Sequence, residues 1–290
     1  MHNFLVFTCF LFFATALPAD GDEIWQQLPA FPPMPKADAS GHADVNDIRM
    51  YYAIYGAGNT ARETVILLHG GLAHSDIWGF QIPPFTAAGY RVVVADSRGH
   101  GRSTRSARPF GYALMASDVA ALMQKLGIGK AAIIGWSDGG IIGLDLAMNH
   151  AEKVSRVFAF GANTNVAGTR PDVGTSPVFN RYMSNMAADY ARLSPAPGEY
   201  GSFMAQIEEM WATQPNYTAE QLASIHVPVV ITDGDHDEAI RQEHDREMTG
   251  LIPGAKLVIF QDASHFAFLQ KPQEFNAAVL EFLRERAALH

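Results

Sequence analysis

The feature that most constrains the fold is a glycine-rich turn at residues 135–140, with the sequence GWSDGG, between two apolar runs. Residues 131–134 form a short run typical of a buried strand, and residues 141–148 have the polar spacing of a buried helix. The pattern G-x-S-x-G between a strand and a helix is typical of a nucleophile elbow, a strained turn that exposes a serine hydroxyl above a sheet. We therefore predict that Ser137 is a nucleophile and that Gly135 and Gly139 relieve collisions in the turn.

The composition limits the partners that the chain is expected to bind. The 290 residues are 48% hydrophobic and 18% charged, which is typical of a globular protein with one large domain or two small ones. The net charge is −9, and the 21 Lys and Arg residues form no long basic run. Nucleic acids and anionic membrane surfaces are therefore disfavoured as partners.

The first residues predict a signal peptide over residues 1–16. An apolar run over residues 4–13 is too short to span a bilayer, and the small residues at 14–16 suit cleavage. A retained anchor or a helix of the folded domain is the alternative. Cleavage removes the only cysteine, Cys9, so the mature chain would have no disulfide, thiolate metal site or cysteine nucleophile. We expect a secreted or periplasmic protein without a membrane span after cleavage.

Beyond this segment, a proline-rich stretch over residues 17–38 reads as an extended lead-in. Strand patterns then alternate with helix patterns, which predicts an α/β fold with a mostly parallel eight-stranded sheet covered by helices on both faces. The core is expected over residues 39–162 and 224–290. The predicted strands are 42–45, 48–55, 64–68, 90–95, 131–134, 154–160, 227–232 and 257–260, and the flanking helices are 80–88, 112–126 and 272–287.

The strand–helix rhythm breaks over residues 163–223, which we interpret as a helical cap on the carboxyl-terminal edge of the sheet. This segment carries aromatic and methionine residues at helical spacing: Phe179, Tyr182, Met183, Met186, Tyr190, Met204, Met210 and Trp211. They are expected mainly to form the core of the cap, because Met fills irregular gaps, with direct substrate contact as the alternative.

A serine nucleophile needs a base and an orienting carboxylate, which this type of fold supplies in the order serine, acid, histidine. The base predicted here is His265, which lies between the last strand and the last helix. The acid is Asp237, because the turn at Gly234 lets it reach back toward the histidine, and Asp235 is the alternative. The same carboxylates could be mistaken for a cation loop. They lack the spacing and the distal bidentate Glu of a calcium site, so no metal is predicted.

These segments together resemble the α/β-hydrolase superfamily over nearly the whole mature length. The resemblance is carried by residues 69–72 (HGGL), 96–103 (DSRGHGRS), the elbow, 234–237 (GDHD) and 264–266 (SHF). The elbow sequence and residues 160–163 (FGAN) are similar to the biphenyl-hydrolase-like branch, which includes valacyclovir hydrolase. One departure is the absence of the proline that relatives often place shortly after the acid.

The resemblance implies that Ser137, His265 and Asp237 form a catalytic triad. It also implies that the backbone N–H groups of Gly71 and Asp138 form an oxyanion hole, and that no cofactor is needed. The expected substrate is a small carboxylic ester or related acyl compound, cleaved through an acyl-enzyme. Lactonase, carbon–carbon bond hydrolase and perhydrolase chemistry on the same triad are alternatives, as is a ligand-binding protein with slow turnover.

Several side chains are candidates for substrate contact: Leu72, Trp136, Asp138, Trp211 and Phe266. The carboxylate of Asp138 is open to two interpretations. It either pairs with an ammonium group on an amino-acyl ester, as the resemblance suggests, or caps the following helix, where Asp is common. His69 is expected to brace its loop rather than to transfer protons. The oligomeric state is not predicted.

Overall fold

The structure is a computed structural model that describes residues 23–60 and 62–285. The predicted signal peptide and the beginning of the lead-in lie outside these residues. Within them, no helix combines the length and the apolar character that crossing a bilayer requires.

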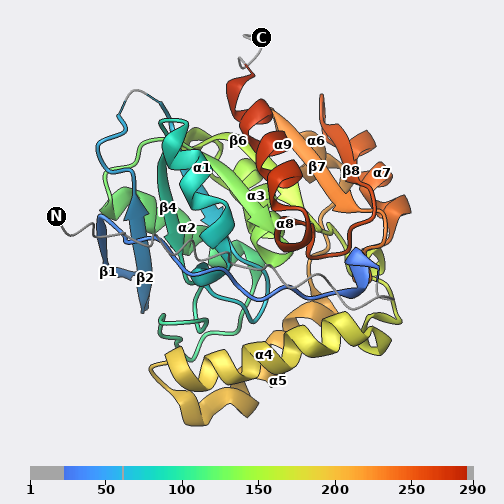
Figure 1. The fold of residues 1–290 in the computed structure, drawn as a ribbon, viewed down its shortest axis with the longest axis horizontal. Coiled ribbons are helices and arrows are strands. Elements are labelled where there is room, and N and C mark those ends of the chain that lie inside the picture. The colour runs from blue at the N-terminus through green and yellow to red at the C-terminus, as the bar shows by residue number, and fades with distance from the viewer. Residues whose placement is uncertain (1–22, 61, 286–290) are drawn as a thin grey trace, which may run out of the picture.

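One eight-stranded sheet forms the centre of the molecule, in the order β1-β2-β4-β3-β5-β6-β7-β8 (Figure 1). The first two strands form an antiparallel hairpin, β2 pairs antiparallel with β4, and the other neighbours are parallel. This confirms the predicted mostly parallel sheet. The strands are β1 (Ala39–Val45), β2 (Ile48–Tyr55), β3 (Thr64–Leu68), β4 (Arg91–Ala95), β5 (Ala131–Trp136), β6 (Val154–Phe160), β7 (Val229–Gly234) and β8 (Lys256–Phe260).

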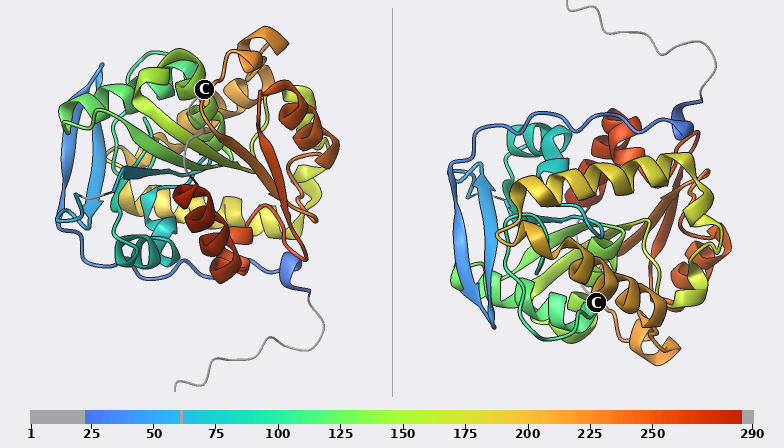
Figure 2. Two further views of the ribbon diagram at one scale, coloured as in Figure 1. Left: turned by 90° about the horizontal axis from the view of Figure 1, so that it is seen from above. Right: turned by 90° about the horizontal axis from the view of Figure 1, so that it is seen from below.

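Helices cover both faces of the sheet, as Figure 2 shows. Helices α2 and α3 lie on one face, and α1 and α9 lie on the other, which encloses the fully buried central strand β5. The core helices are α1 (Ile82–Ala87), α2 (Tyr112–Lys125), α3 (Asp138–Asn149), α7 (Gln242–Leu251), α8 (Ala267–Gln270) and α9 (Pro272–Arg284). Short 3₁₀ helices are η1 (Ile24–Gln26), η2 (Ser75–Phe80), η3 (Ala151–Lys153), η4 (Val166–Gly168), η5 (Val173–Thr175) and η6 (Pro197–Glu199).

Two helical regions differ from the sequence-based expectation. The helix predicted at residues 80–88 is divided into η2 and α1, because α1 begins at Ile82, with the prolines that follow it in its first turn. Helix α7 was not predicted. It has few apolar positions and buries mainly polar residues, so its sequence carries no strong helical stripe.

The segment over residues 163–223 contains α4 (Pro177–Leu193), α5 (Tyr200–Thr213) and α6 (Ala219–Ala223), and α4 and α5 lie below the sheet in Figure 1. The side chains at the spaced aromatic and methionine positions face inward. Tyr182, Met186, Tyr190 and Met210 are buried, and Phe179, Met183, Met204 and Trp211 are partly buried against the core. Most of these residues therefore hold the cap together.

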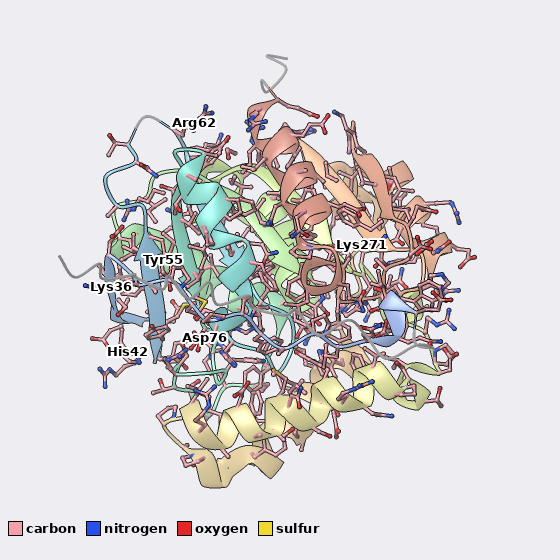
Figure 3. All side chains as sticks on the ribbon, in the orientation of Figure 1. Lys36, His42, Tyr55, Arg62, Asp76 and Lys271 are labelled. Atoms are coloured by element: carbon pink, nitrogen blue, oxygen red, sulfur yellow. The ribbon has the colours of Figure 1, made fainter. Side chains whose placement is uncertain are left out.

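The cap lies at the end of the sheet where the parallel strands terminate. In Figure 3, Asp76 lies on the side of the core facing α4, whereas Arg62, just before β3, lies at the opposite end. Polar contacts tie this side of the core to the cap. His74 Nε2 lies 3.1 Å from Asp189 Oδ2 of α4, and Arg105 Nη2 lies 2.6 Å from Glu199 Oε2 before α5.

Candidate active site

The turn after β5 has the strained geometry expected of a nucleophile elbow. Ser137 has φ 54° and ψ −122°, a conformation that a residue with a side chain rarely adopts. Its N–H donates to the Phe160 carbonyl at 2.7 Å, which fixes the turn against β6. A Cβ at Gly139 would overlap the carbonyl oxygen of Leu68 in β3, and a Cβ at Gly135 would overlap the Gly139 carbonyl. The two glycines are therefore required by backbone contacts.

This crowding predicts a large stability effect for Gly139→Ala. The added methyl group meets backbone rather than a movable side chain, so we expect the free energy of unfolding to fall by about 3 kcal/mol. Gly201→Ala is the matched control, because Gly201 lies in helix α5 with open space around its Cα, and it should be neutral or slightly stabilising. Urea denaturation measures both, and equal midpoints for Gly139→Ala and the wild type would contradict the elbow geometry.

The loops after β7 and β8 bring a carboxylate and an imidazole together. Asp237 Oδ2 lies 2.5 Å from His265 Nδ1, and both side chains are buried. The other oxygen, Asp237 Oδ1, accepts hydrogen bonds from the backbone N–H groups of Ala239 at 2.5 Å and Ile240 at 2.7 Å. A proline at either of these positions would remove one donor, and the chain has none there. Asp235 instead accepts a bond from the Ala263 N–H and does not contact the imidazole.

Asp237 and His265 each stabilise the charged form of the other. Burial opposes ionisation of Asp237, but the His265 charge and several hydrogen bonds outweigh it, so the pKa of Asp237 falls below its usual value. Burial likewise opposes the imidazolium, yet the negative charge of Asp237, aided by Glu238 and Asp138, raises the pKa of His265 above the ordinary value. The imidazole is thus prepared to accept a proton.

The loop of His265 is braced against the elbow. Trp136, which directly precedes Ser137, is buried and donates its indole N–H to the His265 carbonyl at 2.8 Å. A Cβ at Gly161, just after β6, would lie 2.7 Å from His265 Cε1, so the imidazole packs directly on the strand end beside the serine. The carboxyl ends of β5, β7 and β8 thereby hold the three predicted triad residues at one edge of the sheet.

Two backbone amides lie where an oxyanion hole is expected. In the described part of the chain, neither the N–H of Gly71 nor that of Asp138 has a hydrogen-bond partner. Asp138 is the first residue of α3, whose amino end favours negative charge. The loop after β3, which contains Gly71, approaches the elbow closely, since a Cβ at Gly70 would lie 2.9 Å from Ser137 Cβ. Both donors are therefore available beside the serine.

The carboxylate of Asp138 joins the elbow to the cap. It accepts hydrogen bonds from Tyr112 Oη at 2.9 Å and from Trp211 Nε1 of α5 at 3.1 Å. Burial raises the pKa of Asp138 to about 6. Both of these hydrogen-bond partners are side chains, and no backbone N–H of the described residues donates to this carboxylate, so the hydrogen bonds of Asp138 do not cap α3. Recognition of a substrate ammonium group by Asp138 stays a prediction.

The other substrate-contact candidates lie in a closely packed region under the cap. Leu72 is buried, with φ 66°, and Trp136 and Phe266 are buried against the ring of Tyr182. Tyr182 Oη donates to the Gly71 carbonyl, which closes α4 onto the loop of the expected oxyanion hole. The sequence analysis expected Tyr182 mainly in the core of the cap, with substrate contact as the alternative, and did not single out Tyr112. Neither residue has a motif that marks its polar contact.

His69 has the bracing position expected of it. Its Nε2 accepts a hydrogen bond from the Ser97 N–H at 2.9 Å, which ties the loop after β3 to the loop after β4. Burial lowers the pKa of His69 to about 4, so the ring is neutral near pH 7.

The described residues contain two groups with the spacing of metal ligands. The first is Asp233, Asp237 and His265, whose ligand atoms lie within 4.8 Å of one another, and the second is Asp235, His236 and Asp262 near the surface. In the first group, the direct bond between Asp237 and His265 uses the atoms that a metal would need.

The order of the sheet, the serine elbow at the end of β5 and the helical segment over the strand ends define an α/β-hydrolase fold. A family model described as the alpha/beta hydrolase fold matches residues 63–200. The enol-lactonase from Burkholderia xenovorans LB400 has a similar fold, with a TM-score of 0.68 and 24% identity over 84% of this chain and all of that one. The chain therefore has an α/β-hydrolase fold and is similar to this family over residues 63–200.

Curated relatives match most of the chain. A putative carbamate hydrolase, RutD, from Caulobacter sp. (strain K31) is 28% identical over 82% of this chain and 97% of its own length. The human serine hydrolase BPHL is 26% identical over 84% of this chain and 86% of its own length. The predicted resemblance to biphenyl-hydrolase-like proteins is thereby confirmed, and these similarities support a hydrolase.

Proposed function

We propose that this protein is a serine hydrolase that cleaves a small carboxylic ester, or a related acyl bond, through an acyl-enzyme. The observation that carries the proposal is the 2.5 Å contact between His265 and Asp237, beside a strained serine at the head of α3. A serine hydroxyl is a weak nucleophile unless a base accepts its proton, and an oriented imidazole is the group that does so.

In this mechanism, Ser137 Oγ attacks the substrate carbonyl carbon while His265 Nε2 accepts the hydroxyl proton. Asp237 holds the other ring nitrogen, Nδ1, in its protonated form and stabilises the imidazolium. The amides of Gly71 and Asp138 donate to the oxyanion of the tetrahedral intermediate. His265 returns the proton to the leaving alcohol, and an activated water molecule then releases the acyl group from Ser137.

Other acyl-type substrates would use the same groups. RutD is named as a putative carbamate hydrolase, and a carbamate carbonyl would occupy the same position as an ester carbonyl. Lactone, carbon–carbon bond or perhydrolase chemistry on the same triad also remains a candidate. The close packing of Tyr182 and Trp211 on the Gly71 loop supports a small acyl group as the substrate. We also propose that residues 1–16 direct the chain to the periplasm or the exterior.

A turnover experiment with p-nitrophenyl acetate distinguishes an enzyme from a binding protein that reacts slowly. We expect many equivalents of p-nitrophenol per chain at a constant rate. A single equivalent followed by no further release would instead identify a hydrolase-fold binding protein. A panel that adds p-nitrophenyl butyrate, a phenyl carbamate and a simple lactone then ranks the acyl classes by kcat/KM.

The pH dependence of kcat/KM tests the assignment of His265 as the base. Only the neutral imidazole accepts the serine proton, so activity should fall tenfold per pH unit below the pKa of His265. Because Asp237, Glu238 and Asp138 raise that pKa, we expect the midpoint above about 6.5, the ordinary value for histidine. A profile between pH 5 and 9 measures it, and constant activity from pH 5 to 8 would contradict this role.

A further inference from the structure

A second buried carboxyl group lies directly behind the proposed acid. Asp233, the penultimate residue of β7, lies just before the loop that carries Asp237 and is fully buried. Its Oδ1 accepts a hydrogen bond from the Gly234 N–H at 2.8 Å, whereas its Oδ2 is buried and has no recorded partner among the described residues. A ligand-type oxygen of Asp233 lies within 4.8 Å of the corresponding atoms of Asp237 and His265.

A third carboxyl group faces the same place from α7. Asp245 is fully buried, and neither of its oxygens has a recorded partner within the described ranges. Burial and the charge of Asp237 raise the pKa of Asp245 to about 7, and the side-chain interaction with Asp233 acts in the opposite direction. The remaining charged groups near this cluster are His265, the half-buried Glu238, and the more exposed Arg170 and Arg246.

These carboxyl groups cannot all be ionised. Two carboxylates that share a buried site repel each other, and each loses the hydration that stabilises its charge. A proton held between them replaces this repulsion with a hydrogen bond, as in any buried pair of acids. The ionised member of the group is Asp237, because it already accepts two backbone N–H bonds and the His265 N–H.

We propose that Asp233 is a positioning residue that remains protonated and donates its Oδ2 hydrogen to a carboxylate oxygen of Asp237. This inference rests on the proposed catalytic roles of Asp237 and His265. Burial and the charge of Asp237 hold the pKa of Asp233 well above its usual value, which agrees with the assignment. The donated hydrogen would fix Asp237 in its orientation and reduce the negative charge that it presents to the imidazole.

The proposal fixes the sign of the change in the pKa of His265 when Asp233 is replaced. In Asp233→Asn, an amide N–H replaces the carboxyl O–H as donor to Asp237, so the midpoint of the acid limb of kcat/KM should move by less than about 0.3 pH units. In Asp233→Ala, Asp237 loses a donor and attracts the imidazolium more strongly. The midpoint should then rise, and kcat should fall about tenfold to a hundredfold, the effect of losing a hydrogen bond to a charged group.

An ionised Asp233 gives the opposite result. Both substitutions would then remove a negative charge close to His265, and the midpoint should fall by about one pH unit or more. A downward shift in Asp233→Asn therefore overturns the proposal, as does an Asn variant as impaired as the Ala variant. If the Ala variant does not fold, the Asn variant alone still decides the sign, because its shape is nearly unchanged.

Two controls separate this proposal from the proposed function. Asp235→Asn alters a carboxylate on the same loop that bonds the Ala263 N–H and not the imidazole, so its midpoint should match the wild type. The proton NMR signal of the His265 Nδ1–H should persist in Asp233→Asn and shift in Asp233→Ala. If the wild type lacks both an acid limb and this signal, the triad assignment fails first. If both are present and the midpoint of the acid limb falls in Asp233→Asn, only the proposed role of Asp233 fails.

Discussion

Replacing Ser137 with Ala is expected to lower kcat by about 10³- to 10⁶-fold, because the substitution removes the only atom proposed to form a covalent bond to the substrate. The fold should persist. Ala retains the Cβ, so the strained backbone at φ 54° meets the same contacts, and the bond from the residue 137 N–H to the Phe160 carbonyl does not involve the side chain. Steady-state hydrolysis of p-nitrophenyl acetate measures the loss, and urea denaturation measures the fold.

The residual rate of this variant is itself informative. The amides of Gly71 and Asp138 would still polarise a bound ester, so hydrolysis above the rate in water should remain. A Ser137→Ala variant that retains more than about a tenth of the wild-type kcat, with an unchanged urea midpoint, would show that another group attacks the carbonyl.

Asp237→Asn is expected to lower kcat by about 10⁴-fold. This loss is typical of replacing the triad acid by its amide, which holds the histidine in the wrong tautomer. The reason lies in the two sides of this carboxylate. Oδ1 accepts from the Ala239 and Ile240 N–H groups, so the amide oxygen of Asn must take that place and its NH₂ must face His265 Nδ1. Nδ1 then becomes the acceptor, the ring proton moves to Nε2, and the imidazole can no longer accept the serine proton.

The comparison that isolates this effect uses Asp235→Asn, which changes the neighbouring carboxylate of the same loop without touching the imidazole. Its kcat should remain within about threefold of the wild type, on the view that substitutions away from such networks have small effects. If the two variants lose activity equally, the loop matters only for stability. If Asp235→Asn loses far more, the acid has been assigned to the wrong residue.

The elbow could be predicted from the sequence because its constraints are local. A serine held at positive φ needs glycines where its neighbours touch backbone, so residues 135–140 carry the pattern directly. The position of His265 also followed from order along the chain, since the loop after the last strand ends at the same edge of the sheet. For Asp237, the turn at Gly234 favoured it over Asp235 but left both possible.

The contacts that complete the region under the cap could not be predicted in this way. Tyr112 and Trp211 meet Asp138 from helices 26 and 73 residues away along the chain. Helix α7, which supplies Asp245, has a polar sequence that resembles a surface segment. Such pairings depend on how the cap and the strand ends pack in three dimensions, and no short spacing encodes them.

The most direct test of the account is the site of covalent modification by a fluorophosphonate, which reacts with an activated serine beside an oxyanion hole. Digestion and mass spectrometry of the inactivated protein should show one adduct per chain on Ser137, with loss of activity proportional to labelling and much slower labelling of Asp237→Asn. An adduct on a different residue, or full activity in protein labelled at Ser137, would contradict the central claim that this serine is the nucleophile.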